Sequence, residues 1–278
     1  MGFHGGNNLY KVQTDTNISR TAAGEISLNI MDTWKYYGIT HRGHLVCNPT
    51  SEAKLDELVQ LLPLKPGARV LDIACGKAEF LLRTVERHDC SGTGVDISPY
   101  EVDEAKRRTK NRNLGATVEI VLANGSEYEI EPHSFDLAMC IGATWIWNGY
   151  AGTIEALKKA VVPGGLIAIG EPYKMHEPSP EYAATEPDFV ESLLSHAGNV
   201  ETAIQFGLTP LYTSVSNHDD WDRYESLQWL AAEEYAREHP EDPDVPELLE
   251  RTRISRDTYL RHGRDTLNWA IYLFRSPG

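Results

Sequence analysis

Short apolar runs alternate with longer amphipathic stretches through the middle of this 278-residue chain. The apolar runs lie at residues 69–73, 92–96, 117–122, 135–140 and 166–170. The stretches between them repeat their apolar positions every three or four residues, as helices do. Strands that alternate with helices at this spacing predict an α/β protein with a doubly wound, mostly parallel sheet. Two later apolar runs, 211–216 and 269–274, bring the expected sheet to seven strands.

The flanking regions follow a different pattern. Residues 21–62 repeat apolar positions at helical spacing, so residues 1–64 are expected to form an N-terminal helical cap. Residues 65–278 are then expected to form the main domain. Its segment around 171–200 carries four prolines and several acids, which favours a lid or connector rather than core structure. Further helices are expected around residues 219–262.

The central feature is the turn that follows the first strand. Asp72 ends an apolar run, and the small residues Ala74, Cys75, Gly76 and Ala78 follow it before a helical stretch begins. Small residues let a ligand approach the main chain closely, and a helix N-terminus presents free N–H groups. By itself this turn is also compatible with a purely structural strand-to-helix connection.

Polar residues also close the next strands. Asp96 ends the second strand, and Asn124, Gly125 and Ser126 follow the third. Because parallel strands end at one edge of a sheet, these residues and the first turn are expected to lie near one another. An acid at the position of Asp96 suits the two hydroxyls of a ribose, although a helix cap is equally compatible with it.

Charge and cysteine content narrow the function classes. The formal net charge of −15 disfavours nucleic-acid and membrane partners, whose phosphates require Lys and Arg. The four cysteines have no CxxC spacing, so we expect free thiols in a reducing compartment. With no leader-like or membrane-spanning segment in the sequence, the expected location is the cytoplasm.

These residues together resemble the class I S-adenosylmethionine-dependent methyltransferases, from residue 65 to 172 in order. The matching stretches are Asp72–Glu79, Gly94–Ser98, Ala123–Ser126, Phe135–Ala138 and Pro163–Gly165. The stretches Cys140–Trp145, Gly170–Tyr173 and Trp221–Glu225 look like a bacterial subgroup of uncharacterised small-molecule methyltransferases. Two positions depart from the family pattern: Ala78 replaces a glycine, and Asn124 replaces an aspartate.

The resemblance implies a Rossmann-like fold and S-adenosyl-L-methionine as cofactor. It implies cofactor-binding roles for three groups of residues. The methionine part would be held by Asp72, Ala74, Cys75 and Gly76, and the ribose by Asp96. Ile97 would pack against the adenine, whose edge would be bound by Asn124, Gly125 and Ser126. Beside the sulfonium would lie Cys140 and Gly142. Cys140 is expected to fill space rather than to act as a nucleophile.

The acceptor side is less specified by the sequence. Glu171 and Tyr173 follow the fifth strand and His44 lies in the N-terminal region; these three are the candidates for catalysis or acceptor binding. Trp145 and Trp147 are compatible with acceptor orientation or with packing. His41, His44 and Cys47 are three residues apart, but Gly43 indicates a turn, so no metal site is expected.

The sequence therefore predicts a methyltransferase that acts on a small-molecule acceptor. Two alternatives remain at this point: a protein that binds the cofactor without methyl transfer, and a nicotinamide-dependent oxidoreductase. The second alternative predicts a GxGxxG turn, which Asp72–Ala78 does not match. The acceptor atom and the oligomeric state are not specified by these patterns.

Overall fold

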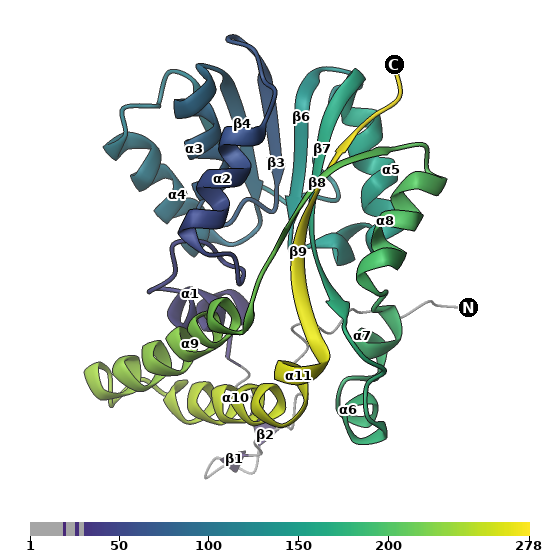
Figure 1. Ribbon diagram of the computed structural model, residues 1–278. Coiled ribbons are helices and arrows are strands. Elements are labelled where there is room, and N and C mark those ends of the chain that lie inside the picture. The colour runs from purple at the N-terminus through teal and green to yellow at the C-terminus, as the bar shows by residue number, and fades with distance from the viewer. Residues whose placement is uncertain (1–18, 21–25, 28–30) are drawn as a thin grey trace.

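The computed structural model describes residues 19–20, 26–27 and 31–278. A seven-stranded sheet in the order β5-β4-β3-β6-β7-β9-β8 crosses the molecule (Figure 1). Its strands are β3 (Arg69–Ile73), β4 (Ser91–Asp96), β5 (Val118–Leu122), β6 (Phe135–Ile141), β7 (Val161–Lys174), β8 (Thr209–Val215) and β9 (Leu267–Arg275). The first five strands are parallel, and β9 runs antiparallel to both β7 and β8. The expected seven-stranded, mostly parallel sheet is confirmed.

The strand order reverses direction between β3 and β6. From β3 the chain proceeds outward to β4 and β5, then returns to place β6 on the other side of β3. Loops that leave neighbouring strands in opposite directions open a crevice at the carboxyl ends of those strands. The turn after β3 and the end of β6 both lie at this switch point.

Helices cover both faces of the sheet. One face packs against α2 (Glu52–Leu61), α3 (Glu79–His88) and α4 (Pro99–Asn111), and the other against α5 (Tyr150–Ala160) and α8 (His196–Gln205). Because side chains alternate along a strand, β3 sends Val70 into the first core and Leu71 into the second.

A third group of helices lies beyond the carboxyl ends of the parallel strands (Figure 1). It consists of α1 (Thr33–Thr40), α9 (His218–Glu238) and α10 (Val245–Thr258), followed by a π-helical turn (Tyr259–Gly263) and α11 (Arg264–Thr266). A reciprocal pair of hydrogen bonds between Asn217 and Asp220 caps the N-terminus of α9. Met31, Tyr36 and Leu248 belong to the small core that joins α1 to α9 and α10.

The N-terminal expectation is wrong in part. Residues 26–27 form the strand β2 (Ile26–Ser27), which pairs antiparallel with β1 (Ser19–Arg20), so no helix covers them. The first helix, α1, begins only at Thr33, where the side chain of Asp32 accepts a hydrogen bond from the Lys35 N–H at 2.8 Å. The other positions of the expected helix before residue 31 lie outside the described residues.

The segment 171–200, expected to be a lid or connector rather than core structure, carries regular elements and a small buried cluster. Strand β7 continues four residues past Gly170, because β9 pairs with it as far as Lys174. Pro172 has no N–H to donate to a neighbouring strand. It is tolerated because β6 pairs with β7 only as far as Gly170. The short helices α6 (Pro180–Thr185) and α7 (Pro187–Ser192) follow, and their residues Tyr182 and Phe189 pack against Leu267 in a small buried cluster.

Candidate active site

The turn after β3 has an unusual backbone. Ala74, Gly76 and Ala78 adopt positive φ angles of 58°, 52° and 58°, a region that costs an alanine about 1–2 kcal/mol. A Cβ atom added at Gly76 would lie 3.5 Å from the Cys47 sulfur. The N–H of Cys75 donates to the carbonyl of Val95 at 3.1 Å, which ties the turn to the neighbouring strand β4. The result is a tight loop whose main chain faces the crevice at the switch point.

Two buried acids stand at this turn. The Oδ1 atom of Asp72 is buried and has no hydrogen-bond partner among the described residues. Asp96 accepts hydrogen bonds from the N–H groups of Gly76 and Ser98, both at 2.8 Å. Burial raises the pKa of Asp72 well above its ordinary value, and the charge of Asp96 raises it further. An unpartnered buried carboxyl is costly, so Asp72 is suited to a cationic ligand group.

The residues expected at the adenine lie on the next two loops. Ile97 follows Asp96 and is 39% exposed, so an apolar surface is available there. The Oδ1 atom of Asn124 accepts hydrogen bonds from the N–H and the hydroxyl of Ser126, at 3.1 and 2.9 Å. Its amide oxygen therefore stabilises the turn, and its NH2 group is the part left to donate to a ligand. A Cβ at Gly125 would lie only 2.6 Å from Ile73, which explains the glycine.

The end of β6 closes the crevice. Cys140 is fully buried, and burial raises the pKa of its thiol, so the side chain is a packing group with no thiolate character. Gly142 has a φ of 90°, and its N–H donates to the carbonyl of Gly170 at 3.0 Å. A Cβ at this position would lie 3.1 Å from the indole of Trp269. The backbone of β6 therefore turns sharply at the point where the crevice ends.

Glu171 and Tyr173 extend from the carboxyl end of β7. Glu171 is half-buried, and its Oε2 atom accepts a hydrogen bond from the Thr144 hydroxyl at 2.8 Å. Burial raises the pKa of Glu171 to about 8. Tyr173 lies opposite Asn268 in the sheet, and the two side chains are hydrogen-bonded. Thr144 begins the 3-10 turn Thr144–Trp147, in which Trp145 is 38% exposed.

The third candidate, His44, sits in the loop between α1 and α2. Its Nε2 atom lies 2.8 Å from the carbonyl oxygen of Tyr224 in α9, so that nitrogen carries the proton and donates. His41 contacts the hydroxyl of the same tyrosine at 2.9 Å through its own Nε2. Burial lowers the pKa of both histidines, which keeps them neutral. Within the described part of the chain, no group of His, Cys, Asp or Glu has an arrangement that could hold a metal ion.

One residue of the site was not singled out by its sequence position. The Lys77 ammonium is buried and donates hydrogen bonds to the carbonyls of His41 and His44, at 2.5 and 3.0 Å. Arg108 of α4 binds the carbonyls of His44 and Leu45 from the other side. The loop that carries His44 is thus held on the turn after β3. The sequence signal that could have identified Lys77 is its position as a charged residue within a turn of small residues.

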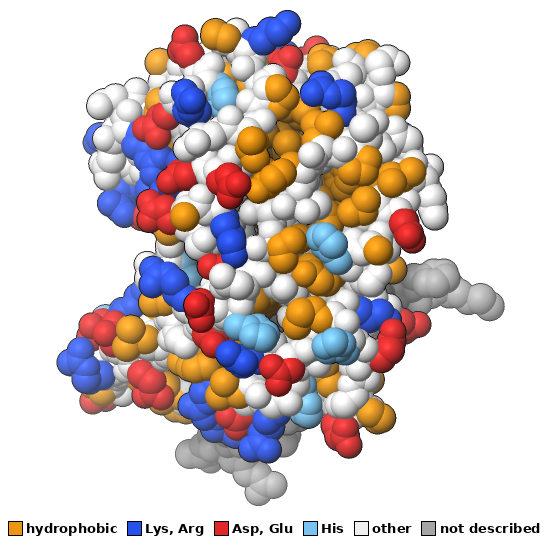
Figure 2. All heavy atoms as spheres, in the orientation of Figure 1, with side chains coloured by type: hydrophobic (Ala, Val, Ile, Leu, Met, Phe, Trp, Pro, Cys, Tyr) orange, Lys and Arg blue, Asp and Glu red, His pale blue; other side chains and the backbone are white. Residues whose placement is uncertain are grey.

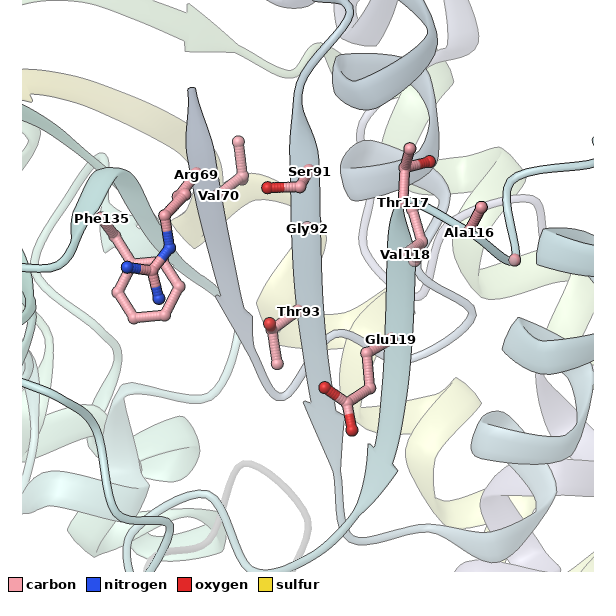
Figure 3. A pocket seen from close by; sticks show the side chains of 11 residues that line it. Arg69, Val70, Ser91, Gly92, Thr93, Ala116, Thr117, Val118, Glu119 and Phe135 are labelled. Atoms are coloured by element: carbon pink, nitrogen blue, oxygen red, sulfur yellow. The ribbon is translucent and has the colours of Figure 1, made fainter. Parts of the chain in front are cut away.

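Two cavities lie near these strands at opposite ends. A cavity of about 50 Å³ separates the loop at Leu45–Thr50 from the turn at Asp72–Lys77. A shallower one, of about 250 Å³, lies at the amino ends of β3, β4 and β5 (Figure 3). The Arg69 guanidinium there lies over the Phe135 ring, 5.0 Å from its centroid. Among the candidates, Asp72, Ala74, Cys75 and Gly76 line the smaller of these cavities, and Gly125 and Ser126 line a third one of about 560 Å³. These candidate residues lie at the carboxyl ends of the strands, away from the cavity in Figure 3.

Comparison with known proteins agrees with this geometry. A family model described as "Methyltransferase domain" matches residues 70–165. The uncharacterized protein YjhP of Escherichia coli K12 is 30% identical over 244 residues, which cover 87% of this chain and 98% of YjhP. A 27-O-demethylrifamycin SV methyltransferase of Amycolatopsis mediterranei is 29% identical over 116 residues, which cover 42% of this chain and 43% of that enzyme.

A solved structure extends the comparison to most of the chain. The S-adenosylmethionine-dependent methyltransferase of Geobacter sulfurreducens, crystallised with S-adenosyl-L-homocysteine, is 30% identical. Its TM-score is 0.81, over 86% of this chain and 97% of that one. The fold is thus shared over nearly the full length of that enzyme, and this chain belongs to the S-adenosylmethionine-dependent methyltransferases.

Proposed function

We propose that this methyltransferase acts on a small-molecule acceptor in the cytoplasm and binds its cofactor at the turn between β3 and α3. The observation that carries the binding site is the buried, unpartnered carboxyl oxygen of Asp72 beside Asp96 and the turn at Gly76. A carboxyl in this state is stabilised by a cation, and the amino-acid end of S-adenosylmethionine carries an ammonium group.

The residues of the site fit the cofactor's three parts. Asp72 and the main chain of Ala74, Cys75 and Gly76 would hold the amino-acid part. Asp96 accepts hydrogen bonds from the N–H groups of Gly76 and Ser98, and the acceptor capacity left on its carboxylate would serve the ribose hydroxyls.

The adenine would be held by the next loops. Ile97 offers an exposed apolar side chain, and the Asn124 NH2 group is left to donate to the base. Gly125 and Ser126 complete that turn, and Cys140 and Gly142 close the end of β6. When bound, S-adenosylmethionine supplies a methyl group on a sulfonium leaving group; the protein's own contribution is to align the acceptor and exclude water.

On the acceptor side we assign distinct roles to the three candidates. Glu171 is the proton acceptor, because a carboxyl with a pKa near 8 is poised to exchange a proton near neutral pH. Tyr173 orients the acceptor together with Asn268. His44 is a positioning residue, since its Nε2–H is committed to the Tyr224 carbonyl and fixes the loop over the crevice.

The surface supports a small acceptor rather than nucleic acid. The net charge is −15, and Figure 2 shows Lys and Arg side chains intermingled with Asp and Glu on the visible face. No described helix has the length and apolar composition needed to cross a bilayer. All four cysteines are free thiols, which is typical of a reducing compartment.

Calorimetry with S-adenosyl-L-homocysteine tests the cofactor site directly. The wild-type protein is expected to bind one equivalent, and Asp72→Asn is expected to bind more weakly because the negative charge is lost. A metabolite fraction incubated with methyl-labelled S-adenosylmethionine should then yield a labelled small product. Transfer of the label only to RNA, DNA or protein fractions would contradict the proposed acceptor class.

A further inference from the structure

An unpartnered acid lies in α9, outside the cofactor turn. Glu225 is 8% exposed, and its Oε2 atom is buried without a hydrogen-bond partner. None of the described Lys, Arg or His residues forms a salt bridge with it. The neighbouring acid Asp222 is different, because it is paired with Arg264 at 2.9 Å. Burial raises the pKa of Glu225 to about 8.

Aromatic residues share the helix face of this carboxyl. Trp221, Glu225 and Trp229 are spaced four residues apart, so they lie on one face of α9. The ring of Tyr259 lies 6.1 Å from that of Trp221 and 6.4 Å from that of Trp229, which places a third ring against both tryptophans. The Nε1 atom of Trp229 is itself buried without a partner.

Tyrosines from other elements lie within the electrostatic reach of the same carboxyl. Burial raises the pKa of Tyr36, Tyr182 and Tyr259, and the charge on Glu225 raises each of them further. These tyrosines belong to α1, α6 and the π-helical turn after α10. Glu225 is therefore at the meeting point of the helices that lie beyond the carboxyl ends of the strands.

The same turn of α9 is connected to both sides of the candidate active site. Tyr224, next to Glu225, binds the imidazole of His44 in the loop over the cofactor turn. Trp221 donates from Nε1 to the Asn268 side chain at 3.2 Å, and Asn268 is hydrogen-bonded to Tyr173 at the end of β7. Glu225 thus adjoins the region between the cofactor turn and the end of β7, where an acceptor is expected.

We propose that Glu225 and the rings of Trp221, Trp229 and Tyr259 bind a cationic nitrogen group, a protonated amine or quaternary ammonium, of the acceptor. The proposal rests on the proposed function, since it names the acceptor class of that site. Aromatic faces and a carboxylate both attract an organic cation, and a desolvated site strengthens the attraction. A cation also supplies the counter-charge that Glu225 lacks, and the Trp229 N–H is available to an oxygen of the same ligand.

The test uses choline and its neutral isostere 3,3-dimethylbutan-1-ol as probes, titrated into the full chain saturated with S-adenosyl-L-homocysteine. Calorimetry is expected to detect choline binding at least about tenfold tighter than binding of the isostere. Glu225→Gln should remove that preference, and Trp229→Phe should weaken choline binding. Glu233→Gln, which changes an exposed acid on the same helix, should have no effect.

The outcomes separate the two proposals. If the variants bind S-adenosyl-L-homocysteine as wild type does but lose only choline, the cation site is supported. Equal binding of choline and the isostere, no binding of choline, or unchanged choline affinity in Glu225→Gln would overturn it. If the wild-type protein does not bind S-adenosyl-L-homocysteine, that result would instead contradict the proposed function. Circular dichroism of each variant shows whether it is folded. If Glu225→Gln is misfolded, Trp229→Phe provides the test, and unchanged choline affinity in that variant would overturn the proposal.

Discussion

The buried ammonium of Lys77 donates a 3.0 Å hydrogen bond to the main-chain carbonyl of His44. A second bond from the same ammonium reaches the carbonyl of His41. Lys77 belongs to the turn after β3, and the two carbonyls belong to the loop that covers this turn. One side chain thus joins the proposed cofactor-binding turn to the loop above it, and through His44 to α9.

Replacement of Lys77 should therefore weaken cofactor binding, even though the Lys77 side chain need not contact the cofactor itself. In Lys77→Met the two carbonyls lose their shared donor, and Arg108 alone then holds the loop that lines the cavity together with the turn. We expect S-adenosyl-L-homocysteine affinity to fall by about tenfold, which corresponds to roughly 1.4 kcal/mol. Calorimetry measures this, with the exposed Lys65→Met as control. Equal affinity in the two variants would show that the loop does not depend on Lys77.

Asp96 should contribute to cofactor affinity and to the shape of the turn. Asp96→Ala removes the acceptor for the N–H groups of Gly76 and Ser98 as well as both proposed ribose contacts. Cofactor affinity should fall by about 1–3 kcal/mol. Calorimetry with S-adenosyl-L-homocysteine checks the value, and Asp103→Ala, on the exposed side of α4, serves as the matched control. Unchanged affinity would remove Asp96 from the ribose site.

Tyr173 should affect turnover more than cofactor binding. Tyr173→Phe leaves the ring, which packs 4.9 Å from that of His196, but removes the hydroxyl bonded to Asn268. Once an acceptor is in hand, the rate of product formation should fall while S-adenosyl-L-homocysteine affinity stays constant. Tyr212→Phe is the control, because its hydroxyl bonds Glu57 at the surface. Equal turnover of Tyr173→Phe and wild type would exclude an acceptor role for this hydroxyl.

The half-buried acid Glu171 should make stability depend on pH. Its pKa is about 8 in the folded protein and 4.5 in the unfolded chain, so the folded state holds more protons between these values. The free energy of unfolding should therefore fall as the pH rises from about 5 to 8, by up to about 1.4 kcal/mol per pH unit for this group.

Urea unfolding at several pH values measures this slope. Glu171→Gln should make it shallower, because the amide has no proton to lose. Glu225, whose pKa is also about 8, contributes with the same sign, so Glu225→Gln should reduce the slope as well. If neither substitution changes the slope, other titratable groups must account for the pH dependence of stability.

Much of the fold follows from local pattern. The runs at residues 69–73 and 135–140 are apolar because their strands are buried on both faces, and this burial is visible in the sequence. Asp72 and Asp96 are also found locally, since Asp96 is the last residue of β4 and Asp72 the second-last residue of β3. The pattern gave a wrong prediction in two places. Residues 26–27 were expected to be helical but form a strand, and β7 was expected to end at Gly170 but continues to Lys174.

The sequence by itself determined the sheet and the residues at its strand ends, because strand periodicity and turn chemistry depend on near neighbours. Only the tertiary structure decided which distant groups meet. It brought Lys77 under the loop of His44 and paired Tyr173 with Asn268. It also buried Glu225 within electrostatic reach of tyrosines from α1, α6 and the turn after α10. A carboxyl in an amphipathic helix has the same sequence signature whether it faces water or a neighbouring helix, and packing alone separates the two.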